Sequence, residues 1–299
     1  MASAPSAVKK FPRLKTFFIV NPRSGRATRA LATVRAFAQT HGAALALTER
    51  PRHASELAAR ALTDGCELIV AVGGDGTLNE VASVLTATGA TFGLVPCGSG
   101  NGLGRHLGIH GSIARALTIL HTGRARLIDT GLADGHPFFT AAGIGFEAEI
   151  SARFNRLTNR GFQRYLTTGA SLLREWVPLD CTVAHAGLRE RVRAFTLAVA
   201  NGSQYGNNAH IAPGALLDDG LLDLAAVPPV TPLNAVPLLT RLFSGTLADA
   251  SDVMLRRGAR FVVERPAAGL LHTDGETHHA GAHVEFTVRP ASLRVMAPA

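Results

Sequence analysis

The chain is poor in cysteine, lysine and long apolar runs, and each shortage excludes a class of protein. Its three cysteines, at positions 66, 97 and 181, are too few and too far apart for a disulfide framework or a CxxC zinc or redox site. Lys9, Lys10 and Lys15 are its only lysines, so no GxxxxGK[ST] phosphate loop exists. No apolar run approaches the roughly 18 residues of a membrane span, and residues 1–15 hold no apolar signal-peptide core. We therefore expect a cytoplasmic protein.

The remaining composition is typical of a folded globular protein with excess positive charge. Apolar residues make up 46% of the 299 positions, and 31 glycines occur without a three-residue period, so disorder and collagen are excluded. The net charge of +8 favours anionic partners: nucleic acid, nucleotide phosphates or an acidic membrane surface. The arginines are scattered and no helix-turn-helix or zinc-finger spacing occurs, so we expect no nucleic acid as partner.

Short β-rich runs alternate with amphipathic stretches over the first third of the chain. The predicted strands span residues 16–20, 45–47, 67–72 and 91–95, and the predicted helices span residues 28–40, 54–62 and 77–85. This βαβαβαβ order is typical of an α/β domain with a parallel sheet.

Beyond about residue 129 the pattern changes to paired short strands around Gly and Asp turns. The predicted strands there span residues 127–133, 137–142, 221–227, 260–263, 284–289 and 293–296. We therefore predict an α/β domain over residues 1–128, to which residues 290–299 return, and a β-rich domain over residues 129–289. Residues 233–247 match a helix with an apolar face beside Arg241, and we expect that face to pack on its own domain rather than on a membrane.

Residues 70–80, VAVGGDGTLNE, carry the most informative motif. The apolar strand ends at two glycines, which let the backbone turn tightly, and a helix is predicted to begin at Thr77 with Glu80 as its capping-box partner. The free N–H groups and the dipole of a helix N-terminus favour phosphate, and the Asp75 carboxylate could hold Mg²⁺ on the same phosphates. The alternative is a plain hairpin turn, which the preceding strand and following helix disfavour.

Two more loops follow predicted parallel strands. In residues 98–104, GSGNGLG, Leu103 stands where GxGxxG needs its third glycine, so a Rossmann fingerprint is not supported. Cys97 stands two positions before Ser99, so a GxSxG nucleophile elbow is excluded. Two interpretations of residues 98–104 remain: a loop rich in backbone N–H groups, suited to phosphate or ribose, and a plain turn. Because ligands of open α/β sheets bind beyond the carboxyl ends of the strands, we expect this loop, the 73–79 loop and residues 21–25 to converge.

Four segments in this order resemble the diacylglycerol kinase catalytic-domain family, which includes bacterial lipid kinases, sphingosine kinases and ceramide kinases. They are residues 21–25 (NPRSG), 73–77 (GGDGT), 98–101 (GSGN) and 273–276 (TDGE), so the resemblance spans nearly the whole chain. It implies an N-terminal α/β domain related to NAD kinases, a C-terminal antiparallel β-sandwich-like domain, and ATP between them. The ATP contacts that it implies are Asn21, Pro22, Arg23, Ser24, Gly25, Thr48, Gly73, Gly74, Asp75, Gly76, Thr77, Leu78, Asn79 and Ser99.

The resemblance also implies catalytic and metal-binding groups. Asp274 or Glu276 would be the base, and Asp75 and Glu276 would hold Mg²⁺ at the catalytic site. A structural Mg²⁺ site would use the Asp219 carboxylate and the carbonyl oxygens of Leu216 and Leu221, with Asp129 linked to it through water. Independently of the family, an Asp-Gly-Glu turn can supply one carboxylate for a hydroxyl proton and one for a metal, although such turns are also common in hairpins.

Three positions depart from the pattern of the family. Gly102 stands where an acidic residue commonly follows the asparagine, which is closer to the sphingosine and ceramide kinase form. Thr140 and Glu147 replace the usual Asn and Asp. These changes bear on the acceptor lipid more than on the nucleotide.

The resulting prediction is an ATP-dependent lipid kinase that transfers the γ-phosphoryl group to a hydroxyl of a diacylglycerol-like or sphingoid lipid at an anionic membrane surface. Glycine loops and arginines would position the triphosphate, Mg²⁺ would neutralise developing charge, and Asp274 would accept the hydroxyl proton. The alternatives are a kinase for a soluble acceptor, as in NAD kinases, and a non-catalytic nucleotide- or lipid-binding module. We expect cytoplasmic localisation with peripheral membrane association; the oligomeric state, a homodimer included, stays open.

Overall fold

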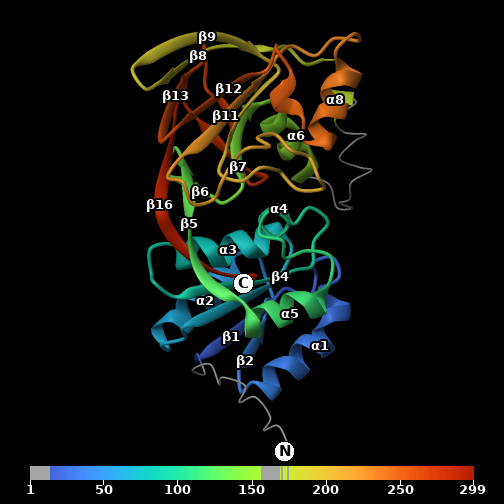
Figure 1. The fold of residues 1–299 in the computed structure, drawn as a ribbon, viewed down its shortest axis with the longest axis vertical. Helices are drawn as coiled ribbons and strands as arrows, with labels where there is room; N and C mark the ends of the chain where they lie inside the picture. Colours follow the sequence, from blue (N-terminus) through green and yellow to red (C-terminus); the bar gives the residue numbers. More distant parts are fainter. Residues whose placement is uncertain (1–13, 156–168, 170, 174) are drawn as a thin grey trace, which may run out of the picture.

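The computed structural model describes residues 14–155, 169, 171–173 and 175–299, so Lys9 and Lys10 lie outside the described residues. One half of the molecule alternates strands with helices, and the other half consists mainly of antiparallel strands (Figure 1). The long last strand of the chain runs from one half into the other (Figure 1).

The N-terminal half has the predicted alternation of strands and helices. Strands β1 (Thr16–Val20), β2 (Ala44–Leu47), β3 (Leu68–Gly73) and β4 (Thr91–Pro96) pair in parallel in the order β2-β1-β3-β4. Helices α1 (Ala27–Thr40), α2 (His53–Thr63) and α3 (Asp75–Leu85) connect them. β3 and β4 are buried along their whole length, which explains their continuous apolar sequences.

Two short helices follow β4 that the sequence pattern did not predict. They are α4 (Gly102–His106) and α5 (Ile113–Thr122). The Ser112 hydroxyl accepts a hydrogen bond from the Arg115 N–H at 3.3 Å and so caps the start of α5. The glycine-rich loop that begins at residue 98 therefore connects a strand, β4, to a helix, α4, and is not an isolated turn.

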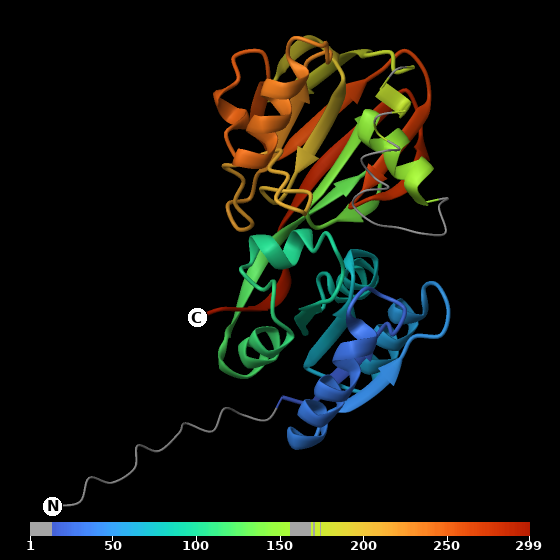
Figure 2. The same ribbon diagram turned by 90° about the vertical axis from the view of Figure 1, so that its right-hand side faces the viewer.

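The C-terminal half is built from antiparallel strands. They are β5 (Arg124–Ala133), β6 (His136–Phe138), β7 (Ala141–Gly145), β8 (Leu179–His185), β9 (Leu188–Ala194), β10 (Thr196–Ala200), β11 (Leu222–Val227), β12 (Met254–Gly258), β13 (Arg260–Glu264), β14 (Gly269–Thr273) and β15 (Glu276–Ala280). Six of them form an antiparallel sheet in the order β12-β11-β10-β7-β14-β15. Helices α6 (Phe146–Asn155) and α8 (Ala235–Ser244) lie towards the right of this half in Figure 1, and the quarter turn of Figure 2 separates them, with α8 at the left and α6 at the right.

The last strand, β16 (His283–Ala297), joins the two halves into one ten-stranded sheet. The two predicted strands at 284–289 and 293–296 are one strand whose register shifts between Arg289 and Leu293. Its end pairs in parallel with β4, with Arg294 opposite Thr91. The predicted boundary at residues 128 and 129 falls inside β5, so that exact division stays a prediction.

The predicted helix at 233–247 is shorter than expected and only partly packed. α8 ends at Gly245, which has φ of 75°, and a 3₁₀ turn follows at Leu247–Asp249. Leu238 and Leu247 pack in the core of this half, as expected, whereas Val236 is 70% exposed, so only part of the apolar face packs on its own domain. Among the helices in the described part of the chain, none is long and apolar enough to cross a bilayer.

Candidate active site

The three loops after β1, β3 and β4 converge, as the sequence predicted. The Asn21 side chain donates a hydrogen bond to the Thr77 hydroxyl at 3.0 Å, which joins the first loop to the second. The Arg26 N–H donates to the Cys97 carbonyl at 3.0 Å, which joins the first loop to the third. A Cβ on Gly98 would lie 2.9 Å from the Gly74 Cα. The three backbones are therefore in direct contact at the carboxyl edge of the parallel sheet.

Gly25 is required by this contact for two reasons. Its φ is +49°, a left-handed conformation that residues with a Cβ rarely adopt. A Cβ at this position would also lie 2.1 Å from the Cys97 carbonyl oxygen. Any larger residue would push the first loop away from the third.

The Asp75 carboxylate holds the third loop, the one after β4, in place. It accepts hydrogen bonds from the N–H groups of Asn101 and Gly102, both at 2.9 Å. Burial raises the pKa of Asp75, these backbone N–H groups lower it, and the negative charge of Asp274 raises it further. The Asn79 side chain, one turn beyond Asp75 on α3, binds Asp274, so the two carboxylates lie near the same end of that helix.

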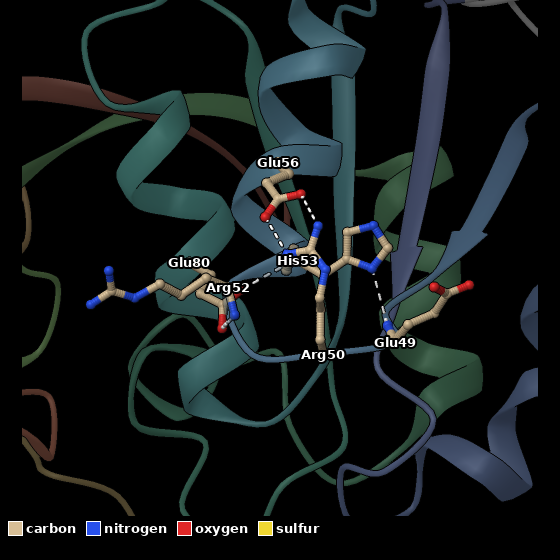
Figure 3. Close-up of polar contacts among 7 residues, drawn as sticks. Glu49, Arg50, Arg52, His53, Glu56 and Glu80 are labelled. Carbon is tan, nitrogen blue, oxygen red and sulfur yellow. Dashed lines mark hydrogen bonds and ion pairs between the residues drawn. The ribbon is translucent and has the colours of Figure 1, made fainter.

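The predicted capping box of Thr77 and Glu80 is wrong. α3 begins two residues earlier, at Asp75, and its N-cap makes no side-chain hydrogen bond. The Glu80 carboxylate instead accepts from the N–H groups of Arg52 at 3.3 Å and Ala54 at 3.0 Å, at the start of α2 (Figure 3). Glu80 thus caps the neighbouring helix, because α2 and α3 pack side by side.

The acidic turn between β14 and β15 meets the three converging loops and α3 through Asp274. One carboxylate oxygen accepts from the Thr140 N–H at 2.8 Å, the Ala141 N–H at 3.0 Å and the Thr140 hydroxyl. The other accepts from the Phe139 N–H at 2.7 Å and the Asn79 side chain at 3.1 Å. Since Asn79 belongs to α3, this bond ties the acid from the end of the chain to the first half.

The other predicted site residues lie around these loops. The Thr48 N–H donates to the Val20 carbonyl at 2.9 Å, so Thr48 lies beside the carboxyl end of β1. Arg23 in the first loop and Ser99 in the third are exposed, as is Glu276 just beyond the acidic turn. Their roles, and those of Pro22, Ser24, Gly73, Gly76 and Leu78, stay predictions.

The predicted structural cation site lies in the loop between β10 and β11. Asp219 accepts from the Leu221 N–H at 3.0 Å and pairs with the Arg257 guanidinium, which also contacts Asp223 at 3.1 Å. Two carboxylates thus share one cation, and the Asp223 Oδ2 is buried without a partner. A divalent cation held by the Asp219 carboxylate and the Leu216 and Leu221 carbonyls fits this charge, although Arg257 competes for the same carboxylate.

Asp129 has a structural role beside this loop. Its carboxylate is buried and accepts from the N–H groups of Gly220 and Ala291, both at 2.7 Å. It therefore fastens the β10–β11 loop to the register shift in β16. In the part of the chain that the structure describes, no three Asp, Glu, His or Cys residues are grouped around one point as metal ligands.

A cavity of about 530 Å³ borders the acidic turn. Asp274 and Gly275 line it, together with β7, β10, β11, α6 and α8. Most of its wall is apolar; Phe146, Ile150, Phe195, Leu238 and Leu242 are examples. Its volume is typical of small-molecule binding sites. The sequence pattern gave no sign of this cavity, because its wall is assembled from segments far apart in the chain.

A hydrogen-bonded cluster of three polar side chains lies in the wall of the cavity. Glu147 accepts a hydrogen bond from the Tyr205 hydroxyl and pairs with the His272 Nε2 at 3.1 Å. The side chains of Glu147 and His272 are 13% and 5% exposed. Glu147 was noted in the sequence only as a departure from the family.

Family models match both halves of the chain. Residues 15–133 match the diacylglycerol kinase catalytic domain, and residues 140–297 match the YegS C-terminal NAD kinase beta sandwich-like domain. A Pseudomonas fluorescens protein named "Probable lipid kinase YegS-like" is 33% identical over 84% of each chain.

Two solved structures share the fold. A crystal structure of a diacylglycerol kinase from Bacillus anthracis superposes with a TM-score of 0.72 at 18% identity, covering 95% of this chain and 96% of that chain. An NAD kinase from Archaeoglobus fulgidus in complex with ATP has a TM-score of 0.55 at 14% identity, covering 94% and 93%. At these identities the likeness establishes the two-part architecture alone.

Proposed function

The chain belongs to the diacylglycerol kinase catalytic-domain family and is a phosphotransferase with an alcohol group as acceptor; on this basis we propose that it is an ATP-dependent lipid kinase. In this proposal the γ-phosphoryl group of ATP passes to a hydroxyl of a diacylglycerol-like or sphingoid lipid. The observation that carries the proposal is the apolar cavity whose wall includes Asp274.

The convergent loops suit a triphosphate. The N-terminus of α3, which follows Gly73 and Gly74, presents backbone N–H groups and a positive dipole end to an anion. The exposed guanidinium of Arg23 in the first loop adds a positive charge nearby. Phosphoryl transfer depends mainly on positioning and charge neutralisation, so this arrangement supplies what the reaction needs.

Two carboxylates near these loops suit a divalent cation that accompanies the nucleotide. They are Asp75, in the first turn of α3, and the exposed Glu276, which directly follows the acidic turn that Asn79 ties to α3. Mg²⁺ at this position would neutralise charge on the phosphates.

The acceptor proposal rests on the chemistry of the cavity. Its apolar wall suits an acyl or sphingoid chain, and Asp274 at its edge suits the hydroxyl end of the same molecule. Glu147, Tyr205 and His272 are the polar groups available to orient that end. A soluble nucleotide acceptor would leave the apolar wall without a partner.

The proposal is tested by incubating the purified chain with labelled ATP, Mg²⁺ and separate acceptors: dioctanoylglycerol, sphingosine, ceramide and NAD. Label on one of the lipids is the expected result. Label on NAD alone would overturn the lipid proposal in favour of a soluble acceptor. Saturable ATP binding with no labelled product would instead indicate a non-catalytic binding module.

A variant that narrows the cavity tests the acceptor site separately. Ala209 lines the cavity, so Ala209→Leu should raise KM for the lipid several-fold while KM for ATP stays constant. Ala44→Leu, at an exposed position on β2, is the matched control and should change neither constant. An unchanged lipid KM in A209L would contradict this assignment of the cavity.

A further inference from the structure

Three large apolar side chains in and just before α8 are exposed to solvent. Leu233 is 91% exposed, Val236 is 70% exposed and Leu239 is 52% exposed. Val236 and Leu239 are three residues apart and therefore lie on the same side of the helix. We call these three residues the α8 patch. Single exposed leucines need no explanation, but a contiguous apolar patch on a helix usually marks a binding surface.

The α8 patch is continuous with the cavity. Leu239 is exposed and also lines the cavity, so it lies at the cavity mouth. Leu173 has the same two properties, with 41% exposure, and approaches the mouth from the segment before β8. Leu238 and Leu242 of α8 line the interior. One helix thus carries apolar surface from the outside of the molecule into the cavity.

The charge of this segment fits a lipid surface. Between Asp223 and Asp249 the sequence contains no acidic residue, and Arg241 is its only Arg or Lys. An apolar helix with one cation can enter the headgroup region without desolvating a carboxylate, and its cation is attracted to anionic lipids.

We propose that the α8 patch inserts into the surface of a lipid bilayer, with the mouth of the cavity against the membrane. This rests on the proposed function, because a membrane lipid must pass from the bilayer into the cavity to reach Asp274. The orientation gives that lipid a continuous apolar route. Leu239 and Leu173 would contact the bilayer at the mouth, and the acidic turn would stay on the protein side.

The test compares the wild-type chain with the double variant Leu233→Ser/Val236→Ser in vesicle flotation. Neither residue lines the cavity, and both are exposed, so the fold and the phosphate loops should be unaffected. Vesicles of phosphatidylcholine, with and without phosphatidylglycerol, are the probe. In the proposed complex these two side chains are buried in the bilayer, so their replacement should lower the partition coefficient at least about tenfold on both kinds of vesicle.

Leu188→Ser is the matched control. Leu188 is 58% exposed and is the first residue of β9; the β8–β9 hairpin reaches the left edge of this half in Figure 1, whereas α8 lies on the right. This variant should float with vesicles as the wild-type chain does. All three proteins should phosphorylate dispersed dihexanoylglycerol at the same rate, because that acceptor needs no membrane docking.

Several results would overturn the docking proposal. Wild-type flotation of L233S/V236S would do so, and so would equal loss in L188S. A concentration-dependent dimer that the double variant abolishes, without vesicle binding by the wild-type chain, would assign the α8 patch to a second copy of the chain. The proposed function fails separately, if the wild-type chain floats with vesicles but phosphorylates no lipid in either form.

Discussion

Replacement of Asp274 by Asn tests whether this carboxylate mainly holds the surrounding backbone through hydrogen bonds or accepts the proton of the substrate hydroxyl. A carboxylate offers about four lone-pair positions. Asp274 accepts five hydrogen bonds: three from backbone N–H groups of residues 139–141, one from Thr140 and one from Asn79. All its lone pairs are therefore engaged in this arrangement. Glu276, the first residue of β15 just beyond this turn, is exposed, so its carboxylate is accessible to a substrate proton.

The structure sets the size of the expected effects. Asp274→Asn turns one oxygen into an NH₂ group, so at least one backbone N–H, such as that of Phe139, faces another donor. An unpaired buried N–H costs about 1–3 kcal/mol, and the loss of charge weakens each remaining hydrogen bond by roughly 1 kcal/mol. With Oδ2 as the amide, three hydrogen bonds remain on Oδ1, so the sum is roughly 4–6 kcal/mol and should lower Tm by roughly 10–20 °C. Glu276→Gln alters an exposed side chain and should change stability by less than about 0.5 kcal/mol.

Thermal unfolding and transfer of label from ATP to dioctanoylglycerol should be measured on both variants. We expect D274N to lose both stability and activity. We expect E276Q to keep its Tm and to lose roughly 10²–10⁴-fold in kcat, the usual contribution of a general base. A D274N variant with wild-type Tm would refute the structural role of Asp274. An E276Q variant with wild-type kcat would remove Glu276 from the chemistry and leave Asp274 as the base.

Three further predictions concern the loops, acid stability and the cation site. Gly25→Ala should destabilise the chain by more than about 1 kcal/mol and raise KM for ATP, since its Cβ would lie 2.1 Å from the Cys97 carbonyl oxygen at a positive φ. Hydrogen bonding to Arg256 lowers the pKa of Glu190 to about 2, so its stabilisation is present at neutral pH and is lost as the pH falls from 4.5 towards 2; Glu190→Gln should flatten that part of the acid-unfolding curve. Arg257→Gln removes the cation shared by two carboxylates, so added Mg²⁺ should raise Tm more in this variant than in the wild-type chain; an equal response would contradict a cation site in that loop.

The sequence predicted the N-terminal half well because its signals are local. Each strand of this half is an apolar run ended by glycine, proline or a polar turn, and each helix has its own apolar period. β1 has the predicted bounds, Thr16–Val20, and β4 extends one residue beyond the prediction, to Pro96. Helices α4, α5 and α6 were missed. α4 has only five residues and α6 is only weakly amphipathic, whereas α5 has an apolar face that was overlooked in the sequence.

The wrong capping box shows the limit of local pattern reading. The spacing of Thr77 and Glu80 fits a capping box, but that pattern does not say which helix end the carboxylate reaches. In the fold, α2 begins beside α3, so the N–H groups of Arg52 and Ala54 at the start of α2 can donate to the Glu80 carboxylate. The α2 N-terminus is thus satisfied by a side chain from another helix, which only the packing of α2 on α3 determines.

The position of Asp274 follows from sheet register rather than from the motif around it. β14 pairs antiparallel with β7, with Thr273 opposite Ala142, so the next residue falls opposite Ala141. The Asp274 N–H accordingly donates to the Ala141 carbonyl at 2.8 Å, and its carboxylate meets the N–H groups just before β7. Because β7 precedes α6 at the cavity wall, the same register brings the acidic turn to the cavity. Asn79 then fixes this turn to α3, 195 residues away in the chain, so the three converging loops and the apolar cavity meet at one carboxylate.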